Sequence, residues 1–320
     1  MPEAITKNRQ SENVIRNLCK KAFGDQNEAV SIKELTDGYC NTAYDIRLSD
    51  GKEVIMKVAP FPSVKLMSCE VDLMKTEVSA MLHAEEMGMY GVPKILFFDD
   101  SCEICTSTCF LMEKLDGNTF SREREHMSEE DAAILHAETG KYLQKLHQIK
   151  GEKFGHFCRS ELQGSDWFDT FEMLIRRVIG DGIAAGIDIG VCYDEILERL
   201  HADRCHFEEV KEPCFLHWDS WEGNIFVKDS KIIGFIDWER AMWGDPLMED
   251  RFRTHSVNPD FLRGYGITEL TESQRIRCRW YDVYLYLIMM FEGFYRQYPD
   301  DSLYQWVHGI FEKVWEDISK

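Results

Sequence analysis

The sequence has no long hydrophobic run. Its longest apolar stretch, residues 283–291, is far shorter than the roughly 20 residues of a membrane-spanning helix, and acidic residues flank it. Residues 1–10 contain no apolar segment of the kind found in a secretory signal. Without a sign of export, the eleven cysteines are typical of reduced thiols, and we expect a cytoplasmic protein with no membrane attachment.

Basic residues are scarce. Lys and Arg number 37 against 57 Asp and Glu, which gives a net charge of −20. Because nucleic-acid phosphates and anionic lipids attract positive charge, neither is an expected partner. The negative field favours a cationic small molecule, although the charge could equally serve only to keep the protein soluble. The sequence does not indicate the oligomeric state.

Histidine is missing beside the only close group of cysteines, Cys102, Cys105 and Cys109. A zinc-type site needs a fourth ligand, and no nearby histidine supplies one. We interpret the three as buried or hairpin cysteines, and a metal or redox role is the less favoured alternative.

The first part of the chain has the pattern of a small antiparallel sheet with one helix. Alternating apolar residues predict strands within residues 30–59, with a tight turn at 49–51. Apolar residues at helical spacing predict a helix over 71–82, and strand-like runs follow at 94–98 and 108–112.

Helices dominate the second part. Ser128 is the expected N-cap of a long helix with an acidic first turn, and helical periodicity continues at 167–179, 193–200 and 275–294. The exception is a short hairpin predicted over residues 224–236. The sequence therefore predicts an α+β fold.

Polar residues flank both ends of this hairpin. His217, Asp219 and Asn224 precede it in the pattern H-x-D-x4-N, and Asp237 and the run Gly244–Asp245–Pro246 follow it. Phosphoryl transfer needs a carboxylate for the attacking hydroxyl and oxygen ligands for magnesium. Each of these residues alone could be an ordinary turn residue, but their combination favours that chemistry.

This combination resembles the signature of the aminoglycoside phosphotransferase and choline kinase families, which are relatives of the protein kinases. An L-x-x-L-H helix end at 143–147 and a following Phe-Gly at 154–155 are also similar, so the resemblance extends over residues 30–251. It implies a two-lobed, protein-kinase-like fold, with a small antiparallel-sheet N-lobe at residues 1–113 and a mainly helical C-lobe at 114–320. The residues that match the signature are His217, Asp219, Asn224, Ile236, Asp237, Trp238, Glu239, Gly244, Asp245 and Pro246.

The resemblance implies a role for each polar residue around the hairpin. Asp219 would be the catalytic base, or at least the carboxylate that orients the hydroxyl. Asn224 and Asp237 would hold Mg²⁺, and His217 would be a structural support. The co-substrate would be ATP or GTP, and the sequence does not distinguish them.

Lys57 is the expected phosphate-binding residue of the first lobe. It is the only lysine in the apolar run 54–58, where a charge is costly without a partner. The resemblance implies an ion pair with Glu77 on the following helix, with Glu70 as the alternative.

The rest of the nucleotide site is also implied by the resemblance. Residues 36–41, with Gly38 as their only glycine, would cover the nucleotide, which makes a weak phosphate loop. The backbone of Glu113 and Leu115 would bind the purine.

Two absences narrow the class of enzyme. The chain has no Walker A motif, and no A-P-E activation segment follows Asp237. The sequence therefore predicts a small-molecule kinase rather than a P-loop enzyme or a protein kinase. A catalytically silent nucleotide-binding module remains an alternative.

The acceptor is predicted from acidic and aromatic residues near the signature: Trp221, Glu222, Glu239 and Trp243. They suit a cationic acceptor through charge pairing and cation–π contact, although each tryptophan could equally be core packing. An aminoglycoside antibiotic, with a role in antibiotic resistance, is the leading candidate, followed by other amino alcohols and then by a neutral metabolite.

Three departures from the family pattern bear on the acceptor rather than on the metal ligands. Trp218 replaces a small residue, the pair Trp221–Glu222 replaces His-Pro, and Glu249 stands where aspartate is common.

Overall fold

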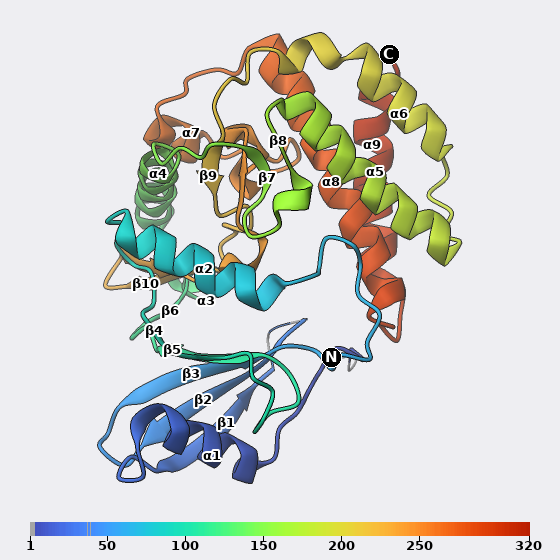
Figure 1. Ribbon diagram of the computed structural model, residues 1–320. Helices are drawn as coiled ribbons and strands as arrows, with labels where there is room; N and C mark the ends of the chain where they lie inside the picture. The colour runs from blue at the N-terminus through green and yellow to red at the C-terminus, as the bar shows by residue number, and fades with distance from the viewer. Residues whose placement is uncertain (1–3, 37, 39) are drawn as a thin grey trace.

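The structure is a computed structural model that describes residues 4–36, 38 and 40–320. A small N-terminal sheet lies beneath a larger, mainly helical part (Figure 1). This architecture confirms the predicted α+β, protein-kinase-like fold. The division of the chain at residue 113 stays a prediction.

The N-terminal sheet has five antiparallel strands in the order β1-β2-β3-β5-β4. All five strands lie within the runs predicted from alternating apolar residues or within one or two residues of them. Their bounds are β1 (Ala29–Leu35), β2 (Thr42–Leu48), β3 (Glu53–Val58), β4 (Ile95–Asp99) and β5 (Cys109–Glu113).

Helix α1 (Glu12–Phe23) covers one face of this sheet, and the sequence analysis made no prediction there. It begins at Ser11, whose hydroxyl accepts a hydrogen bond from Val14 N at 3.4 Å. Its buried residues Ile15 and Leu18 join a separate core that includes the two buried cysteines of the three-cysteine group, Cys105 and Cys109.

Helix α2 (Leu73–Glu86), predicted at 71–82, lies between the sheet and the helical part (Figure 1). Its buried residues, among them Met74 and Val78, belong to the core of the helical part rather than to that of the sheet. The helix packs on the core of the helical part, and its Glu77 contacts Lys57 of the sheet.

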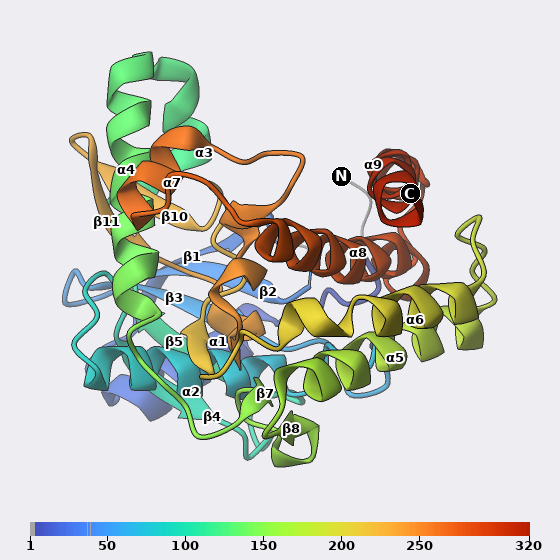
Figure 2. The same cartoon turned by 90° about the horizontal axis from the view of Figure 1, so that it is seen from above.

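The helical part is arranged around α8, which is buried along most of its length and packs against α5 and α9 (Figure 2). Ser128 caps α4 as predicted and accepts a hydrogen bond from Asp131 N at 3.0 Å. The helices are α3 (Phe120–Glu123), α4 (Glu129–Leu146), α5 (Trp167–Ala185), α6 (Tyr193–Ala202), α7 (Pro259–Tyr265), α8 (Glu272–Tyr295) and α9 (Ser302–Ser319). Short 3-10 helices are η1 (Arg124–His126), η2 (Ser160–Leu162), η3 (Arg204–Phe207), η4 (Trp238–Arg240), η5 (Pro246–Met248) and η6 (Asp250–Phe252).

Two small sheets position the signature residues. The predicted hairpin is β10 (Ile225–Lys228) and β11 (Lys231–Phe235), and its turn residues Asp229 and Ser230 have φ of 50° and 54°, as a tight type I′ turn requires. It pairs with β6 (Asn118–Thr119). The other sheet has the order β8-β7-β12-β9, with β7 (Phe154–His156), β8 (Gln163–Gly164), β9 (Cys214–Leu216) and β12 (Met242–Gly244).

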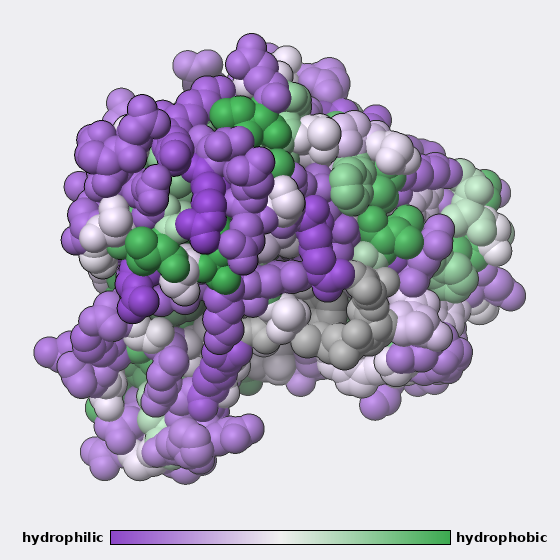
Figure 3. Space-filling view, turned by 90° about the horizontal axis from the view of Figure 1, so that it is seen from below, coloured by the Kyte–Doolittle hydropathy of each residue, from purple (hydrophilic) through white to green (hydrophobic). Residues whose placement is uncertain are grey.

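Seen from the side of the N-terminal sheet, the surface is mostly hydrophilic, and apolar residues gather only in small groups (Figure 3). Within the described residues, no helix is both long enough and apolar enough to cross a membrane.

Candidate active site

The hairpin brings Asp219, Asn224 and Asp237 to one place. Asp219 follows β9, Asn224 precedes β10, and Asp237 follows β11. Asn224 Nδ2 donates to the backbone oxygen of Asp219 at 2.9 Å and to its Oδ2 at 3.0 Å. Ile236 N donates to Asn224 O at 3.0 Å, which ties the two ends of the hairpin together.

His217 is fully buried and has both ring nitrogens engaged. Nε2 donates to the carbonyl of Ile236 at 3.0 Å, and Nδ1 accepts from Asp219 N at 3.3 Å. This pattern requires the neutral Nε2–H tautomer, and burial lowers the pKa of His217 accordingly. A ring with no free nitrogen positions the loop and is not available to carry a proton.

Glu249 holds this loop in place, whereas from the sequence it was only a departure from the family pattern. Its Oε1 accepts from His217 N at 2.6 Å, and its Oε2 accepts from Trp218 N at 3.0 Å and Ser220 Oγ at 2.9 Å. Although burial opposes it, hydrogen bonding and the charge of His147 hold the pKa of Glu249 below its ordinary value. Its place after Gly-Asp-Pro was visible in the sequence, but its three contacts depend on the fold.

Trp218 has a left-handed backbone, with φ of 66°. This region is strained for a bulky side chain, by about 1–3 kcal/mol. The hydrogen bond from its N–H to Glu249 and the burial of its ring oppose that strain.

Lys57 lies between two carboxylates, one from each part of the molecule. Its Nζ is 2.6 Å from Glu77 Oε1, and it also pairs with Asp237 Oδ1. Burial alone would lower the pKa of Lys57, but Asp237 and Glu77 raise it above its ordinary value. Glu70, the alternative partner, instead pairs with Arg296.

Asp219 has an unusual proton affinity. Burial raises the pKa of its carboxyl to about 7, with Asp250, Asp237 and Glu239 adding to the shift and Arg240 opposing it. A carboxyl with such a pKa is well matched to proton transfer near neutral pH.

The free oxygens at the hairpin suit a hard divalent cation. The Asn224 amide nitrogen is occupied by Asp219, and Lys57 takes Asp237 Oδ1, so Asn224 Oδ1 and Asp237 Oδ2 are free of hydrogen bonds from described residues. Mg²⁺ is commonly bound by one or two such groups together with phosphate oxygens. In the described part of the chain, no three His, Cys, Asp or Glu side chains come together as a metal site. The two free oxygens fit a Mg²⁺ ion that is bound together with phosphates.

The expected purine and loop residues lie at or just after the end of β5 and between β1 and β2. Glu113 ends β5, and its N–H already donates to Lys94 O at 2.9 Å; the side chain of Leu115 lies close to Gly234 on β11. Gly38 is exposed between β1 and β2, whereas its expected loop neighbours at 37 and 39 lie outside the described residues. In the same loop, Asn41 Nδ2 donates to Glu239 Oε2 at 2.6 Å.

Comparison with known proteins agrees with this geometry. A model of the APH phosphotransferase enzyme family matches residues 31–249. The chain belongs to this family. Membership of this family makes the protein a phosphotransferase, and thus a kinase. This confirms the prediction made from the signature around the hairpin.

Solved structures share the fold over nearly the whole chain at low sequence identity. A protein from Ralstonia eutropha JMP134 described as an aminoglycoside phosphotransferase has a TM-score of 0.67 and 10% identity, covering 97% of this chain and 99% of its own. The gentamicin complex of APH(2")-IIa has a TM-score of 0.63 and 17% identity, with 96% and 97% covered. A thermostable mutant of APH(4)-Ia with ADP and hygromycin B has a TM-score of 0.66 and 16% identity, with 94% and 97% covered. The search of curated proteins found no significant match.

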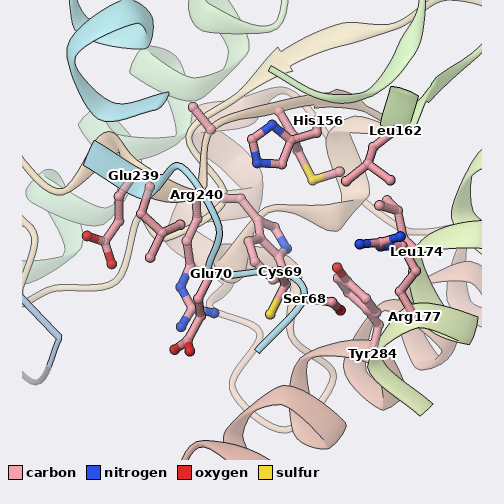
Figure 4. A pocket seen from close by; sticks show the side chains of 14 residues that line it. Ser68, Cys69, Glu70, His156, Leu162, Leu174, Arg177, Glu239, Arg240 and Tyr284 are labelled. Atoms are coloured by element: carbon pink, nitrogen blue, oxygen red, sulfur yellow. The ribbon is translucent and has the colours of Figure 1, made fainter. Parts of the chain in front are cut away.

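A pocket lies beside the loop that carries Trp218 and Asp219 (Figure 4). Trp218, Arg240 and Tyr284 line it, together with Glu239 and Glu70, and its cavity volume is about 40 Å³. The rings of Trp218 and Tyr284 are 5.6 Å apart, and the Arg240 guanidinium lies 5.5 Å from the Trp218 ring.

Of the four residues predicted to contact the acceptor, only Glu239 lines this pocket. The exposed Trp221 ring lies over Gly223, and Glu222 lies 3.6 Å from His136 and 3.9 Å from Arg251. Trp243 packs against Phe157, Phe215 and His83 in the sheet around β12, so the structure does not bring it to the pocket.

Proposed function

We propose that this phosphotransferase moves the γ-phosphoryl group of ATP or GTP to a hydroxyl of a small molecule. The observation that carries the proposal is the convergence of Lys57, Asp219, Asn224 and Asp237 from three separate segments on one centre. These are the groups that such a transfer needs: a cation for phosphates, oxygens for a metal and a carboxylate for the acceptor.

Lys57 would bind the phosphates of the nucleotide. Glu77 keeps its ammonium aligned from the buried side, while the Asp237 side chain stays 34% exposed and open to a ligand. Asn224 Oδ1 and Asp237 Oδ2 would hold Mg²⁺, which neutralises charge on the transferring phosphoryl group when bound. The carbonyl of Glu113 and the backbone of Leu115 would contact the purine.

Asp219 would accept the proton of the attacking hydroxyl and orient it. The Asn224 amide holds its Oδ2, and its backbone is fixed by His217 Nδ1. A carboxylate held in this way loses little freedom when the acceptor binds, so the acceptor meets a preformed base.

The acceptor would carry a cationic group and be small. Glu239 lines the pocket. It accepts a hydrogen bond from Asn41 and makes no ion pair within the described residues. Glu70 is neutralised by Arg296. A cavity of about 40 Å³ has room for only a few waters, so an amino alcohol fits it better than an aminoglycoside of several rings.

One observation favours a second class of acceptor. Arg177 of α5 lines the same pocket, is exposed, and makes no ion pair within the described residues. A free guanidinium binds carboxylates and phosphates well, so an acceptor with an anionic group is the second candidate.

The test is a coupled assay of nucleoside-diphosphate release with Mg²⁺ and ATP or GTP. The acceptor panel contains small amino alcohols, aminoglycosides, and hydroxylated carboxylates or phosphates. We expect stimulation by small amino alcohols. Stimulation only by the anionic compounds would establish the second candidate, and nucleotide binding with no turnover across the panel would contradict a kinase of these acceptors.

A further inference from the structure

The N-terminal segment, residues 4–11, is a built part of the molecule that the proposed mechanism does not use. Ala4, Thr6 and Asn8 are almost fully buried. Ile5 N donates to the carbonyl of Arg296 at 3.1 Å, which fixes the beginning of the segment to the end of α8.

The same segment is fixed to the N-terminal sheet a few residues later. Asn8 Nδ2 donates to Ala59 O at 2.9 Å and to Ser107 Oγ at 2.8 Å. Gln10 N donates to the hydroxyl of Tyr44 at 2.7 Å. The segment therefore runs from one part of the molecule to the other, and Lys7 lies between the two sets of contacts.

Lys7 reaches the loop between β1 and β2. Its Nζ donates to Gly38 O at 2.5 Å and to Asn41 O at 2.8 Å. An ammonium has three donors, so one remains for another acceptor. The Asn41 side chain in turn donates to Glu239, which is two residues beyond Asp237. Asn41 therefore links the Lys7 ammonium to the end of the hairpin where the metal is proposed to bind.

No carboxylate among the described residues lies within ion-pair distance of Lys7 Nζ. Of the described acids, the two whose charges act on Lys7 have other partners, since Glu34 pairs with Arg9 and Glu239 binds Asn41. Burial lowers the pKa of Lys7, with Arg296 adding to this shift and Cys40, Glu34 and Glu239 opposing it. Among the described residues, this half-buried cation is bound only by carbonyls and has no counter-ion, and a polyphosphate would supply one.

We propose that Lys7 is a second phosphate-binding lysine, which contacts the nucleotide from the loop side while Lys57 contacts it from the sheet. The proposal rests on the proposed function, since it assumes that the nucleotide lies at Lys57. The proposal also explains how a loop with a single glycine could bind a nucleotide. The N-terminal segment supplies the positive charge that the loop itself lacks.

Calorimetric titration of ADP and of adenosine, both with Mg²⁺, tests this without knowledge of the acceptor. Replacing Lys7 by methionine keeps the aliphatic stem and removes the charge. We expect ADP to bind about tenfold more weakly or worse, as for a lost charge-assisted hydrogen bond, with adenosine unaffected. Lys7→Arg should restore most of the affinity, and Lys33→Met, at an exposed position on β1, should have no effect.

Lys7→Gln separates phosphate binding from bracing of the loop, because its amide keeps two N–H donors for the loop carbonyls but has no charge. We expect it to behave like Lys7→Met. Wild-type affinity for ADP in Lys7→Gln or Lys7→Met, or an equal loss for ADP and adenosine, would overturn the proposal and leave the kinase assignment intact. Failure of the wild-type protein to bind either ADP or GDP would overturn both.

Discussion

The two sides of the proposed active site are built in different ways. On the nucleotide side, Lys57, Glu77 and Asp237 form a chain of opposite charges between the sheet, α2 and the hairpin. On the proposed acceptor side, the Trp218 ring lies beside Tyr284 and Arg240, and two charged residues of the pocket pair with residues of α8 and its C-cap: Arg240 with Glu292, and Glu70 with Arg296.

From this difference we infer on which side of the site the residue types can vary. The nucleotide side must place a few charges around an invariant ligand, so its residue types are constrained by chemistry. The acceptor side is shaped by packing and by pairs between distant segments, so its specificity depends on residues outside the signature.

The largest effect should come from the residue where the two sides meet. Asp219→Asn keeps the shape of the side chain but removes the base, so kcat should fall by roughly 10²–10⁴-fold with nucleotide affinity little changed. Diphosphate release with the acceptor identified by the panel measures this. Asp229→Asn, in the exposed hairpin turn, is the matched control, and near-normal turnover of Asp219→Asn would remove it from the mechanism.

A smaller loss is expected on the nucleotide side from Glu77→Gln. The amide can still accept a hydrogen bond from Lys57, but the buried lysine loses one of its two counter-charges. We expect about 1–3 kcal/mol lower unfolding free energy and tenfold weaker nucleotide binding. Urea unfolding and calorimetry measure the two effects. Glu85→Gln, exposed on the same helix, should change neither; equal behaviour of the two variants would show that the ion pair is dispensable.

On the acceptor side, Trp218→Gly should relieve the positive φ and open the pocket. Relief of strain offsets part of the roughly 3–5 kcal/mol cost of removing a buried aromatic ring, so a modest net destabilisation is expected. Larger acceptors should gain turnover several-fold relative to small ones, as competition assays would show. Trp306→Gly, exposed on α9, is the comparison; an unchanged acceptor range would place the acceptor elsewhere.

The smallest effect concerns His156, which also lines the pocket. Burial, with Arg159 adding, lowers the pKa of His156 from 6.5 to about 4. The unfolded chain therefore binds a proton that the folded one does not, and the unfolding free energy falls as pH drops through this range.

His156→Asn should reduce the pH dependence of unfolding between pH 4 and 6.5 by about one proton, since Asn can still accept from Cys158 N. His136, whose pKa burial and Arg251 also lower to about 4, should respond in the same way when replaced by Asn. The double variant should show twice the change, and an unchanged slope in either single variant would contradict its buried neutral state.

Much of this site could be predicted from local sequence. The strands between residues 29 and 58 alternate plainly, Ser128 precedes an acidic turn, and the hairpin is bounded by turn residues, so local rules suffice there. Asp219, Asn224 and Asp237 were recognisable because phosphoryl transfer restricts both their types and their order around that hairpin.

The ion pairs beside the pocket could not be predicted, because their partners are far apart in the sequence. Arg296 and Glu70 are separated by 226 residues, and Arg240 and Glu292 by 52, so no local pattern marks them as partners. The prediction that Trp243 contacts the acceptor rested on its neighbours in sequence, and only the fold shows that its ring packs against Phe157 beside β12. The role of Glu249 likewise depends on contacts about 30 residues away.

The proposed function depends on the binding, by Asp237 and Asn224, of the metal that accompanies the nucleotide. Calorimetric titration of ATP into the wild-type protein and into Asp237→Ala, each with and without Mg²⁺, tests it most directly. We predict that Mg²⁺ strengthens ATP binding to the wild type and has no effect on the variant, which keeps Lys57 paired with Glu77. Equal strengthening by Mg²⁺ in both proteins would contradict the account.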